Sequence, residues 1–157
     1  MFMKRPCAAG GVRISQTQQG FTLLEILVSI VVLSIGLLGL AALQVVSLNN
    51  NQTAYYRSIA TQQAYDIADR IRANRTGNYN ALDATIPTDP DCFTNVCTTA
   101  QMVTADHAQW NTSNQRLLPA GSGTVTGAAG IFTITVSWSE KSPTGSAIQT
   151  FITTMAR

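Results

Sequence analysis

The stretch FTLLEILVSIVVLSIGLLGLAALQVVSL, residues 21–48, decides the fold of this chain. After Glu25 it contains no charged residue, and the next charge along the chain is Arg57. About 20 consecutive apolar residues suffice to cross a bilayer as an α-helix. Because no second run of this kind follows, the sequence predicts one transmembrane helix. It argues against both an ordinary soluble globule and a polytopic membrane protein.

A short basic leader, residues 1–20, precedes this run and ends in Gly20; its charges are Lys4, Arg5 and Arg13. Positive charge flanks the run on this side, so the positive-inside rule places the start of the chain in the cytoplasm and the rest outside. A secretory signal peptide would have an apolar stretch of only about 7–15 residues. Conventional cleavage stays open as an alternative because small residues occur at Gly39, Ala41 and Ala42.

The composition excludes several classes of function. Of the 157 residues, 45% are apolar and 11% are charged, against roughly 25% charged in a typical soluble domain. Three of the ten basic residues lie in the leader, so the remainder carries seven basic and eight acidic residues. No basic stripe remains to follow a phosphate backbone, and we expect no nucleic-acid partner.

Glu25 stands directly before the uncharged run, where an ionised carboxylate costs a few kcal/mol if it enters hydrocarbon. It could snorkel to the interface, or stabilise the first turn of the helix through the helix dipole. A sharper interpretation gives it a cationic partner. If the chain were cut after Gly20, the new amine of Phe21 would lie four residues from Glu25, and the same amine on a neighbouring subunit could also reach it.

From Thr53 the pattern becomes amphipathic, with apolar or small residues recurring at helical spacing. We expect one helix from about Phe21 to about Arg75, with residues 21–48 in lipid or partner helices and residues 49–76 packed on a head. The charges near its end predict a solvated face with ordinary ion pairs, a subunit contact being the alternative. These charges are Asp66, Asp69, Arg70, Arg72 and Arg75.

Residues 77–157 predict a small head with one helix and an antiparallel sheet, so the fold class is α+β. The helix is expected over Ala100–Leu118, and His107 in it as a surface or capping residue. Its predicted core residues are Met102, Val103, Trp110 and Leu117. Strands are expected over Thr124–Thr126, Ile131–Ser139 and Ala147–Met155, because apolar and polar residues alternate there.

Two cysteines of the head, Cys92 and Cys97, are separated by four residues. A zinc site would need two more ligands, and His107 is the only histidine, so we expect no metal. In an exported domain, a short loop closed by a disulfide is the natural state of such a pair. Cys7 lies in the leader and should be reduced and then removed.

The residues Gly20-Phe21-Thr22-Leu23-Leu24-Glu25, after a basic leader and before a long apolar run, resemble the prepilin cleavage motif of type IV pilins and type II secretion pseudopilins. In that family a membrane prepilin peptidase cuts after the Gly and methylates the new amine. The resemblance implies cleavage between Gly20 and Phe21, methylation of Phe21, and a docking role for the Glu25 carboxylate.

The rest of the chain is similar to PilV-type minor pilins of the type IV pilus. The likeness is carried by residues 68–75, 118–121 and 134–138 and by the cysteine pair. It implies a minor subunit that helps initiate pilus assembly, with the fibre tip as one position. The implied partners are other minor and major pilins, the prepilin peptidase, the inner-membrane assembly platform and membrane lipid. The implied location is the bacterial inner membrane, with the head in the periplasm, and then the fibre.

Three alternatives stay open at this point. A minor pseudopilin of type II secretion would share the N-terminal half. A membrane-anchored periplasmic enzyme lacks sequence support, because there is no phosphate loop, Gly-x-Ser-x-Gly motif, histidine pair or Cys–His set; we therefore expect neither an enzyme nor a cofactor. A permanent single-span anchor without an assembly role would differ in leaving Gly20 uncut.

Overall fold

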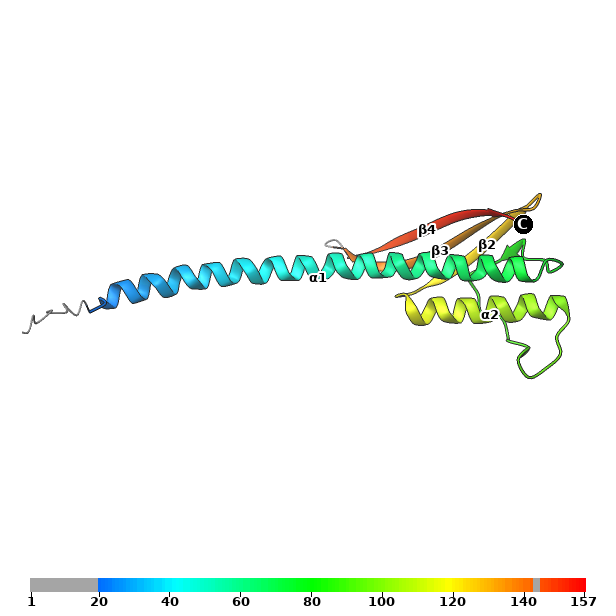
Figure 1. Ribbon diagram of the computed structural model, residues 1–157, viewed down its shortest axis with the longest axis horizontal. Helices are drawn as coiled ribbons and strands as arrows, with labels where there is room; N and C mark the ends of the chain where they lie inside the picture. The colour runs from blue at the N-terminus through cyan, green and yellow to red at the C-terminus, as the bar shows by residue number, and fades with distance from the viewer. Residues whose placement is uncertain (1–19, 143–144) are drawn as a thin grey trace, which may run out of the picture. The chain divides into compact units, whose positions relative to one another are not determined.

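The computed structural model describes residues 20–142 and 145–157 (Figure 1). The predictions about residues 1–19, including Cys7, lie outside this range. Within the described residues, two helices and four strands follow one another, and the predicted α+β class is confirmed. They are α1 (Leu23–Ala73), β1 (Ala81–Leu82), α2 (Thr99–Leu117), β2 (Ser122–Ala128), β3 (Ile131–Ser142) and β4 (Gly145–Ala156). The chain divides into two units, residues 1–44 and 45–157, which are described in turn.

The first unit is the beginning of α1. The prediction of one uninterrupted helix is confirmed, since α1 has no break between Leu23 and Ala73. Every residue of the helix as far as Gln52 is exposed, and the part before Leu48 is long and apolar enough to cross a membrane. Within residues 20–44, the described part of this unit, no side chain is therefore covered by the fold itself.

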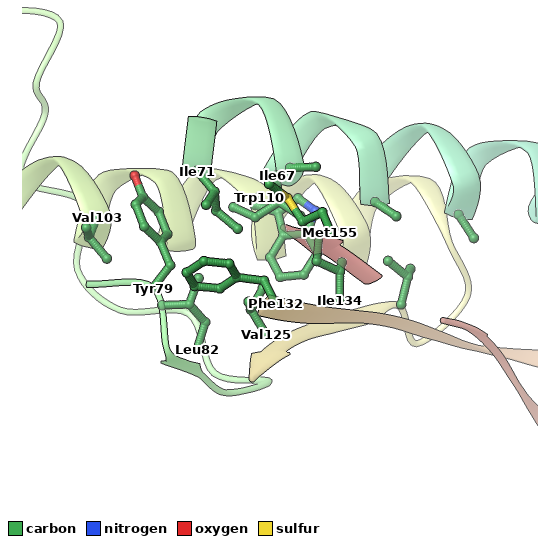
Figure 2. Packing of buried hydrophobic residues seen from close by; sticks show 14 of the residues in the cluster. Ile67, Ile71, Tyr79, Leu82, Val103, Trp110, Val125, Phe132, Ile134 and Met155 are labelled. Atoms are coloured by element: carbon green, nitrogen blue, oxygen red, sulfur yellow. The ribbon is translucent and has the colours of Figure 1, made fainter. Parts of the chain in front are cut away.

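The second unit is a head in two layers, with α1 and α2 against one face of a sheet. The buried side of α1 repeats every three or four residues, the spacing of one helical face. Its members are Ala60, Gln63, Ala64, Ile67, Ala68 and Ile71. Figure 2 shows Ile67 and Ile71 of α1 and Trp110 of α2 directed toward Phe132 and Ile134 of β3.

The sheet is antiparallel throughout, with the order β1-β2-β3-β4. On β3 the buried residues are those predicted to share a face: Phe132, Ile134, Val136 and Trp138. On β4, Phe151 and Met155 point inward, whereas Ile148 and Ile152 lie on the outer face. The β2–β3 turn has positive φ at both Ala129 and Gly130, as a tight hairpin with the right-handed twist of strands requires.

The strands extend beyond the predicted bounds. β2 covers seven residues instead of the predicted three. β3 continues to Ser142, beyond the predicted end at Ser139, and β4 begins at Gly145 instead of Ala147. The strands are longer because backbone hydrogen bonds between them continue beyond the apolar residues from which they were predicted. The two residues of β1 lie outside the three predicted strands.

Two of the four predicted core residues of α2 are confirmed, Val103 and Trp110. Met102 is exposed, and Leu118 is buried in place of the half-buried Leu117. The reason is that α2 ends at Leu117, and Leu118 has an extended backbone (φ −121°, ψ 137°) that directs its side chain differently from a helical residue.

Candidate functional site

The predicted cleavage point lies just outside α1. Thr22 is the cap of the helix: its hydroxyl accepts a hydrogen bond from the amide of Glu25 (3.3 Å), and its carbonyl accepts from the same amide (3.0 Å). Gly20 and Phe21 precede this cap in non-helical backbone and are exposed. The peptide bond between them is therefore not engaged in the helix, as a peptidase substrate needs.

Gly20 has no packing reason to be glycine. A Cβ at this position would meet no atom within 4 Å of the described residues, and its φ lies outside the left-handed region. A requirement for glycine here would come from recognition by another protein rather than from the fold.

Glu25 lies in a shallow groove of about 370 Å³, lined by Phe21, Glu25, Ile26, Ser29, Ile30 and Leu33. It is the only charged residue of this lining. The Ser29 hydroxyl donates to the backbone carbonyl of Glu25 (2.7 Å), not to its carboxylate. The groove thus presents one carboxylate among apolar side chains, which suits a cation that arrives with an apolar segment.

Thr22 was not singled out by the sequence reasoning. The signal that finds it is the spacing Thr22-x-x-Glu25, since a Ser or Thr three residues before an acidic residue is typical of a helix N-terminus. Thr22 fixes where the helix begins, and so leaves Gly20 and Phe21 outside it.

Cys92 and Cys97 are joined by a disulfide. The loop before them is organised by aspartates that accept hydrogen bonds two or three residues on. The hydroxyl and the amide of Thr85 donate to Asp83, and these hydrogen bonds lower the pKa of the Asp83 carboxyl. Within residues 20–142 and 145–157, no three His, Cys, Asp or Glu side chains are grouped as metal ligands.

Asp106 is buried in α2 and binds groups from two other segments. It accepts hydrogen bonds from Arg70 of α1 (3.1 Å) and from the hydroxyl of Tyr79. Burial, and then the hydrogen bond to Asp106, raise the pKa of Tyr79. The indole of the neighbouring Trp110 does not bind Asp106 but donates to the carbonyl of Gln63 (2.9 Å).

His107 is buried, so its predicted surface position is wrong. Its Nε2 lies 2.9 Å from the carbonyl of Asp83. The neighbouring Asn111 amide donates to the carbonyls of Asp83 and Thr85, both at 3.0 Å. These side chains hold the loop after β1 against α2, a structural task that local sequence does not reveal.

The predicted ion pairs on α1 are confirmed: Arg70 lies 3.0 Å from Asp66, and Arg72 lies 2.8 Å from Asp69. The interpretation of this run as a purely solvated face is wrong for Arg70. Its guanidinium is half-buried, because it also pairs with Asp106.

Comparison with known families gives two adjacent matches. Residues 15–41 match the family described as prokaryotic N-terminal methylation motif, and residues 42–108 match the family described as type IV pilin Tt1218. No curated protein and no solved structure matches the chain significantly.

The two matches adjoin and together extend from the leader into α2, and a long apolar helix with a small antiparallel sheet is the architecture of type IV pilins. Over residues 15–108 the chain is therefore similar to type IV pilins.

Proposed function

We propose that this chain is a minor pilin of the PilV type, which helps to initiate assembly of the type IV pilus together with other minor pilins. The observation that carries the proposal is the continuous exposure of apolar side chains on α1 from Leu23 to Leu48. A surface of this extent needs a cover. Lipid supplies it before assembly, and the equivalent helices of other pilins supply it in the fibre.

The chain is made as a precursor with a leader, residues 1–20, and the prepilin peptidase cuts between Gly20 and Phe21 and methylates Phe21. Residues 21–48 then form the membrane-spanning and assembly half of the helix, residues 49–76 the amphipathic half, and residues 77–157 the periplasmic head. The leader stays in the cytoplasm and the head is exported through the inner membrane. The exposed, non-helical position of Gly20 and Phe21 supports cleavage between them.

Glu25 sets the position of the incoming subunit along the growing helix bundle. Among residues 20–56 there is no Lys, Arg or His, so the methylated amine of Phe21 supplies the cation. A subunit placed out of register would leave two unpaired charges in an apolar bundle, which is costly. Pairing of the amine with Glu25 of its own chain competes with this contact, because the two are four residues apart.

The family is one of structural subunits, and we propose no catalytic role and no cofactor for this chain. Its partners are other minor and major pilins, the prepilin peptidase, the assembly platform and membrane lipid, without nucleic acid. A place at the fibre tip fits a subunit that starts the fibre.

The first experiment tests processing in cells that assemble the fibre. Mass spectrometry should find an N-methylated Phe21 as the first residue of the mature chain. Gly20→Leu should leave the precursor uncut in the membrane without changing the fold, since the added side chain meets open space. An intact leader on the wild-type chain, or cleavage near Ala42, would sink the proposal.

The second experiment tests Glu25. Glu25→Gln keeps the size of the side chain and removes its charge, whereas Ser29→Ala, in the same groove, leaves the charge in place. We expect Glu25→Gln to be cut, inserted and folded normally, while co-purification with partner pilins and piliation fall at least about tenfold. Ser29→Ala should behave as wild type. Assembly of Glu25→Gln at the wild-type level would make the intermolecular role wrong.

A strain that lacks the chain separates the pilus from type II secretion. Deletion of the chain should abolish surface fibres and leave exoprotein secretion intact. The reverse result would assign the chain to the secretion pseudopilins.

A further inference from the structure

We propose that the ring closed by the Cys92–Cys97 disulfide is a docking surface for a folded protein whose contact site is an apolar pocket rimmed by Lys or Arg side chains. This contact is additional to the helix-mediated assembly proposed above and does not depend on it. We call residues 92–97 the disulfide ring.

The disulfide ring exposes two apolar side chains almost completely. Phe93 is 87% exposed and Val96 is 102% exposed, the largest values among the exposed large apolar residues of the head. Neither side chain packs on the head core, so the fold does not require them. Aromatic side chains of this kind are the usual anchors of protein interfaces when they enter a pocket on the partner.

The disulfide ring is held in one conformation by its own polar groups. The Thr94 hydroxyl donates to the carboxylate of Asp91 (2.6 Å), and the Asn95 amide donates to the carbonyl of Asp91 (3.2 Å). Asp91 itself has a φ of +53°, which turns the chain sharply into the ring. A rigid display of this kind lowers the conformational entropy lost when a partner binds.

Charge decides the class of partner. Between Arg75 and Arg116 the sequence contains no Lys or Arg, whereas Asp83, Asp89 and Asp91 are exposed before and beside the ring. Arg70, which lines the adjoining groove, is already paired with two carboxylates, Asp66 and Asp106. An anionic lipid surface would repel this segment. A protein pocket with a basic rim would attract it, because complementary charge around an apolar anchor speeds association and excludes other partners.

At Cys97 the disulfide ring adjoins a groove that can receive part of the partner. The groove has a volume of about 390 Å³ and is lined by Arg70, Ala73, Asn74, Cys97, Thr98, Thr99, Met102 and Asp106. Met102, which is exposed although it was predicted to be core, adds an apolar side chain there. The protruding ring and the adjoining groove together form one continuous contact face.

The partner is trapped first, in cells that produce the full chain. Benzoylphenylalanine replaces Phe93, and in a matched strain it replaces Ile148, a comparably exposed apolar residue on the outer face of the sheet. We expect position 93, and not position 148, to give a covalent adduct with one protein, whose linked peptide lies beside Lys or Arg residues.

The affinity of the purified full chain for that purified protein is then measured. Phe93→Ala should weaken binding at least about tenfold, the loss expected for a buried anchor. Val96→Ala should weaken it less, and Ile148→Ala should leave it unchanged. All three variants should unfold at the wild-type temperature, because their side chains are exposed.

The charge argument has its own test. Asp89→Asn together with Asp91→Asn should weaken binding and reduce its dependence on salt, whereas Asp69→Asn on α1 should change neither. Adducts at position 93 with lipid alone, with a second copy of this chain alone, or no more abundant than at position 148 would each overturn the proposal. Failure of Phe21 methylation would overturn the proposed pilus role and leave these results as they are.

Discussion

Tyr79 is fully buried, and its hydroxyl donates to the carboxylate of Asp106 while accepting from the Asn74 amide (3.1 Å). Both burial and the neighbouring carboxylate disfavour the phenolate, so its pKa is raised above the ordinary value of 10.0. A raised pKa means that the unfolded chain loses this proton first as the pH rises. The stabilisation from Tyr79 is therefore complete below pH 10 and is lost as the pH rises from there through the folded-state pKa.

The first prediction follows from the raised pKa of Tyr79. Above pH 10 the free energy of unfolding should fall with a contribution from Tyr79 of up to about 1.4 kcal/mol per pH unit. Urea titrations of the wild type and Tyr79→Phe at several pH values measure it as the difference of the two slopes. Equal slopes in the two proteins would show that the phenol ionises in the folded state as it does in the unfolded chain.

The second prediction concerns Arg157. Its Nη2 donates to the carbonyls of Asn74 (2.8 Å) and Gly77 (2.9 Å), which lie just after α1, and its guanidinium lies over the Phe132 ring at 5.4 Å from the centroid. We expect Arg157→Ala to lower the stability by about 1–3 kcal/mol, since charged hydrogen bonds to backbone are lost. Thermal unfolding measures the loss. Arg116→Ala, at an exposed position of α2, is the control and should have almost no effect.

For single residues, the sequence predicts roles that depend on neighbours in the chain and misses roles that depend on tertiary contacts. Gly20, Phe21 and Glu25 lie within one short motif, so the resemblance to the prepilin motif singles them out together with the basic leader and the apolar run. The burial of His107 and the partners of Asp106 depend on Asp83, Tyr79 and Arg70. These segments are brought to α2 only by folding, which is why the burial of His107 and the partners of Asp106 were not predicted.

Among the elements, the crossing of β2 over α2 gives the third prediction. A Cβ on Gly123 would collide with the Trp110 indole and the Asn114 amide, both in α2. Overpacking of a filled core costs about 1–3 kcal/mol. Gly123→Ala should therefore lower the thermal midpoint, while Gly36→Ala, where the added atom meets nothing within 4 Å, should not. An unchanged midpoint for Gly123→Ala would mean that β2 can move away from α2.

Periodicity determines how well each element could be predicted. The apolar face of α1 and the strict alternation on β3 are long enough to be read from the sequence alone. β1 has two residues and exists only because it pairs with Thr126 and Val125 of β2. The ends of β3 and β4 carry polar residues, so their pairing could not be recognised before the register was known.

For the whole molecule, the buried core begins at Ala60 and the unit that contains it begins at Val45. The fourth prediction is that residues 45–157 alone fold as a soluble domain. Its thermal midpoint should equal that of the head in the full chain, because residues 21–44 contribute no buried side chain. Circular dichroism on both proteins compares the midpoints, and a truncated chain without cooperative unfolding would contradict this division.

The exposure of α1 as far as Gln52 has a consequence for how such a chain can change over evolutionary time. Residues 26–48 are exposed throughout, so a substitution there disturbs no buried side chain of its own subunit, and selection acts on it mainly through whatever surface covers the helix. A substitution from Ala60 onward is judged first by the subunit itself. The two halves of one continuous helix should therefore vary under different constraints. Substitutions in the first half are limited by the surfaces that cover it, and substitutions in the second half by the packing of its own head.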